Sequence, residues 1–309
     1  MAELIRSLSQ QEQLNFLLTN RIPRRFATRF MGWFSGIESK WLTRLSLSIW
    51  QRFSDDLRLE EADKQEFSSL HDCFTRKLKP GAREIDPRAN IITSPCDAIV
   101  GECGPLQGTT AFQAKGFPYE LSDLIPDKAL QDKYRNGMFI TLRLKSSMYH
   151  RFHAPQDCEV REVTYISGDT WNVNPIALRR IENLYCKNER AVMELHDNEN
   201  PDSGICLVAV AAILVASIKL HCLDGNLDMH YTGPSKVHCF AHYSKGDEMG
   251  YFQHGSTIIV FGTGDHALCE GIQCGTQVRM GEALLTKATS ITEQNVGRSR
   301  SGRDVDEVS

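Results

Sequence analysis

The sequence predicts an α+β fold, with a β-rich body of mostly antiparallel strands and a helical segment at the N-terminus. Two observations carry this prediction. Apolar runs recur through the later part of the chain between clusters of Gly, Pro, Asn and Asp, which is typical of strands. The first 53 residues instead carry apolar side chains at helical spacing. With 309 residues, the chain can form one sizeable core, or one core with an appendage.

The N-terminal segment, residues 1–56, is predicted to form amphipathic helices. Its apolar side chains fall into two stripes: Phe26, Phe30, Trp33 and Phe34, then Leu42, Leu45, Ile49 and Phe53, joined by Trp41 and Trp50. The first 53 residues carry eight Lys and Arg against three Asp and Glu, a local charge of +5, which leaves −9 for the rest. A basic, aromatic arm favours binding in the plane of an anionic membrane surface. The alternative is a helical hairpin that packs its apolar stripe on the body.

The body, residues 57–291, is predicted to be mostly β structure. Strands are expected at 98–103, 138–144, 158–166, 191–195, 205–220, 236–241 and 257–262. Helices are expected at about 57–70, 119–133 and 175–184. The last stretch, residues 292–309, is polar with mixed charges and is expected to be a disordered tail.

The composition of the chain limits where the protein is expected to be located and which partners it is expected to bind. The longest apolar stretch, Ile205 to Ile218, is shorter than the roughly 20 residues that a membrane-spanning helix needs. The N-terminus lacks the apolar core of a secretory signal. These features favour a bacterial protein bound peripherally at the cytoplasmic face of the inner membrane. The net charge of −4 argues against a nucleic-acid partner.

The ten cysteines are interpreted as reduced thiols. The chain has no CxxC pair and no signal for an oxidising compartment. A zinc site could be drawn only from His238, Cys239, His242, Cys269 and Cys274, which lack paired ligand spacing. We therefore expect no metal.

The most informative local sequence is Gly255-Ser256-Thr257, at the start of an apolar run. Gly255 leaves its carbonyl unshielded, so the Ser256 hydroxyl could attack it and replace the amide by an ester. β-Elimination of that ester would cut the chain, and the dehydroalanine left at position 256 would hydrolyse to a pyruvoyl group. The alternative is an ordinary turn entering a strand, with Gly for geometry and Ser and Thr for hydrogen bonds.

Two further segments carry side chains that could assist this chemistry. In Tyr149-His150-Arg151-Phe152-His153, either imidazole could carry a proton near neutral pH, although both could be solvated surface histidines. In Ser94-Pro95-Cys96-Asp97-Ala98, the Asp is either a turn former or the buried partner of a histidine.

Taken together and in this order, the segments resemble the phosphatidylserine decarboxylase family, over roughly residues 30 to 285. The family pattern has a Pro-x-Asp-Gly-like segment, a Tyr-His-Arg-x-His segment and a Lys-Gly-x-Glu-Met-Gly-x-Phe-x-x-Gly-Ser-Thr segment, the last matched by residues 245–257. Further matches are 74–86, 113–116, 136–139, 173–175 and 187–190. So many motifs in order make a chance match improbable.

The resemblance implies self-cleavage between Gly255 and Ser256 by a triad of Asp97, His153 and Ser256. His153 would take the proton of Ser256, and Asp97 would stabilise the imidazolium. The products would be a large chain, 1–255, and a small chain, 256–309, that remain associated. Ser256 becomes the pyruvoyl cofactor, which would form a Schiff base with phosphatidylserine and accept electrons during its decarboxylation to phosphatidylethanolamine.

The resemblance also assigns His150 to the decarboxylation or protonation step. It implies a phospholipid-synthesis enzyme that is a homodimer and needs no diffusible cofactor. Two positions depart from the family pattern: His254 replaces the usual Leu before Gly-Ser-Thr, and Ala98 replaces the usual Gly after Asp97. If the backbone at residue 98 needed a positive φ, Ala98 would disturb the placement of Asp97.

Two other classes of function remain open from the sequence. A serine hydrolase could use the same Asp, His and Ser on a separate substrate, although no Gly-x-Ser-x-Gly motif surrounds Ser256. A non-catalytic membrane-peripheral binding module could retain the fold alone. Both predict an uncut chain, and only the hydrolase predicts a serine that reacts with fluorophosphonates.

Overall fold

The computed structural model describes residues 24–287, except 55–56, 115–116, 198–199, 201–202, 214–216, 229 and 254–255; the side chains of 24–27 and 53 are also not described. His254, Gly255 and the expected tail at 292–309 therefore lie outside the described residues. The described residues comprise most of the body and the helices α3 and α4 of the N-terminal segment.

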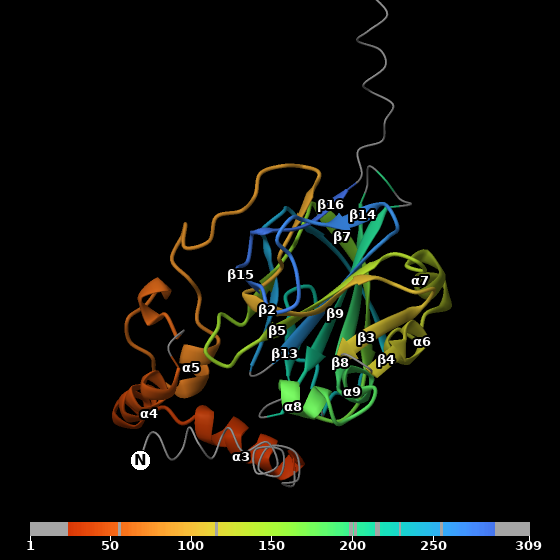
Figure 1. Cartoon of the computed structure of the whole chain (residues 1–309). Coiled ribbons are helices and arrows are strands. Elements are labelled where there is room, and N and C mark those ends of the chain that lie inside the picture. The colour runs from red at the N-terminus through yellow and green to blue at the C-terminus, as the bar shows by residue number, and fades with distance from the viewer. Residues whose placement is uncertain are drawn as a thin grey trace, which may run out of the picture.

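An eight-stranded antiparallel sheet forms the centre of the body (Figure 1). Its strands, in spatial order, are β11 (Lys236–Tyr243), β7 (Cys158–Ile166), β8 (Arg190–His196), β9 (Gly204–Ala211), β13 (Ser256–Gly262), β5 (Met138–Leu144), β2 (Ala98–Pro105) and β15 (Gln277–Val278). Every pairing between neighbours is antiparallel, which confirms that part of the predicted fold class.

Three smaller antiparallel sheets complete the β structure of the described residues. They are β10 (Ile218–Leu220) with β12 (Glu248–Phe252) and β6 (Arg151–His153); β1 (Ile91–Thr93) with β16 (Ala283–Lys287) and β14 (His266–Leu268); and β3 (Thr110–Ala114) with β4 (Phe117–Glu120). The predicted strand 205–220 is two strands, β9 and β10, in different sheets.

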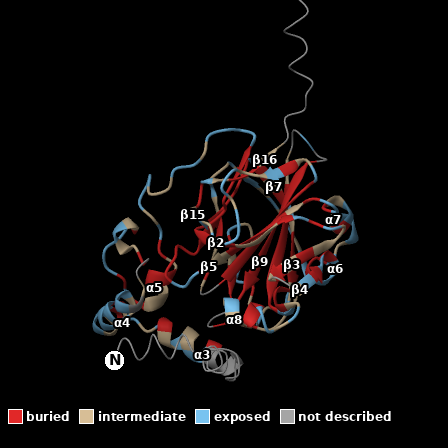
Figure 2. Cartoon of the chain, in the orientation of Figure 1, coloured by how far each residue is buried: buried red, intermediate tan, exposed pale blue. Residues whose placement is uncertain are grey.

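The large sheet is covered on both faces, as the buried strands in Figure 2 show. Along β13, Ile258 and Val260 belong to the core on one face, whereas Ile259 and Phe261 belong to the core on the other. Two-sided burial explains why these central strands have continuous apolar sequences instead of alternating ones. It also confirms that 257–262 is a strand inside the sheet, where β13 pairs with β5 and β9 along its whole length.

Among the described residues, α3 (Arg24–Ser35) and α4 (Lys40–Phe53) are the longest helices. The other described helices are short: η1 (Leu59–Glu61), α5 (Leu70–Phe74), α6 (Leu121–Leu124), α7 (Lys128–Lys133), α8 (Pro175–Leu178) and α9 (Leu184–Lys187). Figure 1 shows α3, α4 and α5 together at one end of the body. Helix α4 buries Thr43 and Leu47, and Leu47 packs in a small core with Ala62, Phe67 and Cys73.

The predicted helix at 57–70 is wrong. Only the single turn η1 forms there, because the backbone of residues 61–63 bonds to residues 77–79: Asp63 N–H donates to the Lys77 carbonyl at 3.0 Å and Lys79 N–H to the Glu61 carbonyl at 2.9 Å. Helix α5 begins at Leu70, where the Ser69 side chain accepts the Asp72 N–H. Tertiary pairing thus overrides local helix propensity.

The other two predicted helices are each divided. The range 119–133 begins in β4 and then splits into α6 and α7 around Pro126, which cannot donate a backbone hydrogen bond. Asp127 then caps α7 by accepting the Ala129 and Leu130 N–H groups. The range 175–184 contains α8, while α9 begins only at Leu184.

Candidate active site

Ser256 is the first residue of the central strand β13 and is fully buried. Its hydroxyl oxygen has no hydrogen-bond partner among the described residues. A buried hydroxyl without a partner costs free energy, and other described hydroxyls, such as those of Thr141, Ser217 and Thr257, share this state. The Ser256 hydroxyl thus has no hydrogen bond to the described residues, and Ser256 directly follows Gly255 in the sequence.

Because side chains alternate along a strand, the neighbours of Ser256 in β13 show to which face of the sheet its side chain points. Ser256 shares a face with Ile258 and Val260, and that core also contains Phe152 of β6 and Phe252 of β12. The sheet that carries the histidine segment therefore packs over the face of β13 that bears Ser256. The chain from β12 to β13 is short, and Phe252 N–H donates to the His150 carbonyl at 3.0 Å just before it.

His153 lies at the end of β6 and both of its ring nitrogens are engaged. Nδ1 lies 2.8 Å from the Gly246 carbonyl oxygen, and Nε2 lies 2.9 Å from the Tyr149 hydroxyl. Because a carbonyl can only accept, Nδ1 carries the proton, and the Tyr149 hydroxyl donates to Nε2 of the neutral ring. Burial lowers the pKa of His153, although the Gly246 carbonyl and the nearby carboxylate of Glu248 oppose this shift.

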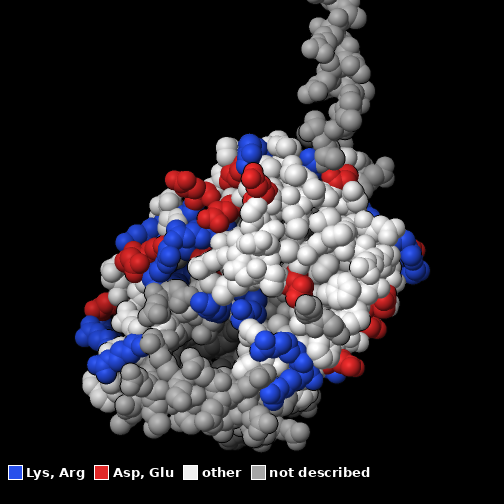
Figure 3. Space-filling model, in the orientation of Figure 1, with Lys and Arg blue, Asp and Glu red and all other residues white. Residues whose placement is uncertain are grey.

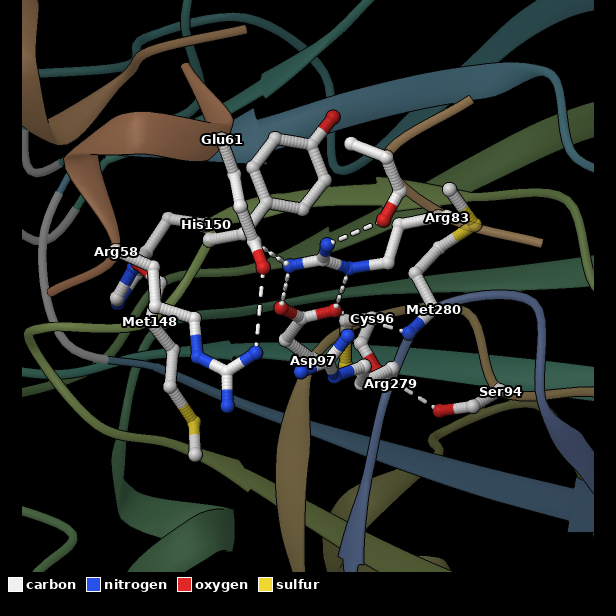
Figure 4. Close-up of polar contacts among 12 residues, drawn as sticks. Arg58, Glu61, Arg83, Ser94, Cys96, Asp97, Met148, His150, Arg279 and Met280 are labelled. Carbon is white, nitrogen blue, oxygen red and sulfur yellow. Dashed lines mark hydrogen bonds and ion pairs between the residues drawn. The ribbon is translucent and has the colours of Figure 1, made fainter. Parts of the chain in front are cut away.

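Asp97 lies just before β2 and is bound by Arg83, not by His153. Arg83 Nε donates to Oδ1 at 2.9 Å and Nη2 to Oδ2 at 2.5 Å, and Met280 N–H also donates to Oδ1 at 2.9 Å. Figure 4 shows the Arg83 guanidinium between the carboxylates of Asp97 and Glu61, with Arg58 next to Glu61.

No hydrogen bond joins any two of Asp97, His153 and Ser256 among the described residues. Their segments are nevertheless adjacent. His153 N–H donates to the Pro95 carbonyl at 2.8 Å, two residues before Asp97. Arg143 of β5 pairs with Ile99 on one side and Thr257 on the other, which places the Asp97 and Ser256 segments two strand spacings apart, roughly 10 Å.

His150 is fully buried and has different neighbours from His153. Its ring packs against Phe74 of α5 with centroids 4.1 Å apart, and its Nδ1 lies 2.9 Å from the Met148 carbonyl oxygen. That carbonyl fixes the proton on Nδ1, so Nε2 is the basic nitrogen of the neutral ring. Because Phe74 stacks in turn on Trp50 of α4, His150 is linked by aromatic contacts to the N-terminal helices.

The Lys-Gly-Asp-Glu-Met segment holds the histidine strand in place. Gly246 has φ of +91°, and a Cβ there would lie 2.2 Å from Cδ1 of Ile85, so no other residue fits without strain. Lys245 Nζ donates to the Arg88 and Ile91 carbonyls, and Glu248 accepts from Arg151 at 2.5 Å and pairs with His221 at 2.6 Å. The segment thus presents the Gly246 carbonyl to His153.

The substitution at Ala98 leaves the backbone regular. Ala98 is buried in β2 and is not among the described non-glycine residues with positive φ, which are Arg58, Asn136, Asn183 and Phe240. The placement of Asp97 therefore needs no glycine after it.

Sequence reasoning gave no role to Tyr149 or Arg83, although both lie within the matched segments. The only signal was a Tyr beside the histidines and an Arg within a Lys- and Arg-rich stretch. Their partners become evident only when the fold brings residues 83 and 97, or 149 and 153, together.

The described residues hold neither a metal cluster nor a membrane-spanning helix. Within this part of the chain, no group of three or more His, Cys, Asp and Glu side chains could hold a metal ion. None of the described helices combines the length and apolar character that crossing a bilayer requires.

Comparison with known proteins assigns the family. The model of the phosphatidylserine decarboxylase family matches residues 70–286. Curated relatives named phosphatidylserine decarboxylase proenzyme include that of Saccharophagus degradans, 32% identical over 89% of this chain and 97% of its own. Those of Erwinia tasmaniensis and Haemophilus influenzae are each 30% identical over 92% of this chain, and over 98% and 100% of their own. The chain therefore belongs to the phosphatidylserine decarboxylase family.

Proposed function

We propose that this protein is a self-cleaving, pyruvoyl-dependent phosphatidylserine decarboxylase that produces phosphatidylethanolamine and CO2. The observation that carries the proposal is the buried Ser256 hydroxyl, which has no partner among the described residues and lies on the face of β13 covered by the histidine strand. The related proenzymes support the same activity.

Self-cleavage would begin when the Ser256 Oγ attacks the Gly255 carbonyl and gives its proton to His153. Nε2 is the accepting nitrogen, because Nδ1–H is donated to Gly246. The C–N bond then breaks and an ester takes the place of the amide. Elimination releases the Gly255 carboxylate and leaves dehydroalanine at position 256, which takes up water and loses ammonia. Asp97 would assist through its negative charge, and Arg83 fixes where that charge lies.

A pyruvoyl group at the start of the small chain supplies the electron sink that decarboxylation requires. The Ser256 hydroxyl, which has no partner among the described residues, lies at the start of β13, where the pyruvoyl group would form. We assign the protonation of the substrate α-carbon to His150, whose buried ring lies next to the segment that precedes Ser256. Its basic Nε2 would take up the proton that the substrate ammonium loses on forming the Schiff base, and would then donate that proton to the α-carbon. Its burial against Phe74 excludes water from that ring.

The N-terminal helices would hold the enzyme at a membrane surface, peripherally and at the cytoplasmic face of the bacterial inner membrane. On α4, Trp41, Leu45 and Ile49 lie four residues apart and are 74%, 44% and 48% exposed. On α3, Phe30 and Trp33 are also exposed. Figure 3 shows Lys and Arg side chains beside a hollow on the face of the molecule that it draws. An exposed apolar stripe next to basic residues suits an anionic lipid surface.

The first test is intact mass spectrometry of the purified protein under denaturing conditions. Processing gives two chains, residues 1–255 and 256–309, the smaller of about 6 kDa. The small chain is expected to be about 17 Da lighter than its encoded sequence, through loss of ammonia. The processed protein should then release CO2 from phosphatidylserine.

A single uncut chain would contradict the proposal. Reaction of that uncut chain with a fluorophosphonate would indicate the hydrolase, and absence of reaction the binding module. The homodimer is a further part of the proposal, and light scattering of the processed protein measures it directly.

A further inference from the structure

A second feature near the cleavage site is a pocket of about 270 Å³ between helix α3 and the body. Its polar lining includes Arg29 from α3, Asp228 and His230 from the body, and Ser217 and Gln253, which lie next to each other at one end of the strand pair β10–β12. Trp33 of α3 closes one side. The walls thus come from the proposed membrane segment and from the segment that leads to Ser256.

The pocket lies close to the reacting residue. Gln253 N–H donates to the Ser217 carbonyl at 3.2 Å, which fixes Gln253 at this wall. Gln253 is only three positions before Ser256, so their Cα atoms are at most about 11 Å apart. The pocket therefore borders the chain segment that leads to residue 256.

Two polar side chains of the pocket, Arg29 and Ser217, could bind a ligand. Arg29 is exposed on α3, and its guanidinium makes no ion pair with the described residues. Ser217 is 3% exposed and its hydroxyl has no partner among the described residues. Leaving a buried hydroxyl without a partner costs about 1–3 kcal/mol, which a ligand oxygen would remove.

The charges suit a headgroup with both signs. Arg29 supplies a guanidinium, the side chain that best matches phosphate oxygens. Asp228 supplies a carboxylate, which accepts the His230 N–H at 2.8 Å through Oδ1. Phosphatidylserine carries a phosphodiester, a carboxylate and an ammonium group, so a pocket with one cation and one anion matches it better than a purely basic pocket.

We infer that this pocket binds the phosphoserine headgroup of the lipid, with Arg29 on the phosphodiester and Ser217 donating to one of its anionic oxygens. This inference rests on the proposed function and extends it: α3 is one wall of the substrate site as well as a membrane contact. A lipid lying in the surface touched by Phe30 and Trp33 would have its headgroup beside Arg29 and its serine group directed toward residue 256.

The test measures decarboxylation of a short-chain phosphatidylserine below its micelle concentration, so that membrane attraction does not contribute. Arg29→Ala is expected to raise KM about tenfold or more, because a charge-assisted hydrogen bond is lost, while self-cleavage is unchanged by mass spectrometry. The Arg29→Lys variant keeps the positive charge but loses the bidentate hydrogen-bonding geometry of the guanidinium. Its KM should therefore lie between those of the wild type and Arg29→Ala. Arg135→Ala, an exposed arginine on the body, is the matched control and should keep the wild-type KM.

Competition identifies the ligand. Glycerophosphoserine should inhibit competitively, and the Arg29→Ala variant should weaken that inhibition; equal inhibition by inorganic phosphate would show a general anion site and overturn the assignment. An unchanged KM in Arg29→Ala would also overturn it, and if that variant is not processed the same comparison is made with Arg29→Lys. Failure of the wild type to cleave or to decarboxylate would instead refute the proposed function.

Discussion

Both ring nitrogens of His153 are engaged in the uncut chain, one by the Gly246 carbonyl and one by the Tyr149 hydroxyl. The first contact fixes the tautomer that a general base needs. The second occupies the nitrogen that must receive the proton of Ser256. Tyr149 must therefore release that nitrogen before His153 can act as the base.

Tyr149→Phe is expected to shift the pH dependence of self-cleavage. A hydrogen bond donated to Nε2 favours neutral His153 and keeps its pKa low, so its removal raises that pKa. Since the base must be neutral, the acid limb of the rate profile should move up by about 0.5 to 1 pH unit. Self-cleavage of the chain made by cell-free translation, followed from about pH 5 to 8, measures this.

The control for that shift is Tyr231→Phe, which removes a hydroxyl that donates to the Pro234 carbonyl instead. Its profile should coincide with the wild type. Coincident profiles for Tyr149→Phe and the wild type would show that Tyr149 does not influence His153.

The ion pair of Arg83 and Asp97 should matter for stability. The two side chains are 4% and 11% exposed, and removal of one partner leaves a buried charge. Arg83→Met in the uncleavable Ser256→Ala chain should lower the free energy of unfolding by about 3–5 kcal/mol, measured by urea denaturation. Adding Asp97→Asn should restore part of the loss, and purely additive effects would mean that the two charges are not coupled.

The sequence indicates which side chains could take part in the chemistry, but not which side chains they contact. Ser256, His153, His150 and Asp97 stood out because few residue types carry protons or attack carbonyls. The partner of Asp97 was not predictable, because Arg83 is fourteen positions away and several other basic residues lie nearby. Contact between side chains depends on the fold, which spacing along the chain does not encode.

At the level of elements, β13 explains why the two chains would stay together. The strand pairs on both sides over all seven residues, and the same chain then supplies β14, β15 and β16 to two sheets. After processing, the small chain should co-elute with the large chain in native size-exclusion chromatography and separate only in denaturant. A small chain that eluted alone under native conditions would contradict this pairing.

The exposed stripe of α4 can be tested separately from catalysis. Replacing Trp41, Leu45 and Ile49 by Gln should reduce flotation of the protein with anionic liposomes, because these side chains lose the apolar surface that a bilayer would bury. Phe240→Gln, which removes an aromatic side chain 64% exposed on β11, is the control and should float as the wild type does. Equal flotation of all three proteins would refute the role of α4.

Strands and helices were predictable from the sequence where a single sequence pattern determines the secondary structure. Continuous apolar runs identified β5, β9 and β13, since strands buried on both faces need no polar side. The segment after α4 was not predictable, because its backbone bonds to residues 77–79 and its apolar side chains serve a small separate core. The short strands β6 and β12 lack a run long enough to show a period.

For the whole molecule, charge is divided unevenly: +5 in the first 53 residues and −9 in the remainder. Attraction of that arm to anionic lipid is screened by salt, whereas the apolar contacts of α4 are not. Liposome binding should therefore weaken as NaCl rises from about 0.05 to 0.5 M, where the screening length falls below about 5 Å. Liposome binding that did not change with NaCl concentration would indicate that apolar contacts alone hold the protein at the membrane.

The pairing of β13 on both sides also has a genetic consequence. Adding one residue within the strand, just after Ser256, would keep every catalytic residue in the encoded protein. With the rest of the strand held by its neighbours, however, the serine would turn to the opposite face of the sheet, away from the histidines. An apolar substitution in this strand would therefore leave Ser256 on its face of the sheet, whereas a change in the strand's length would not.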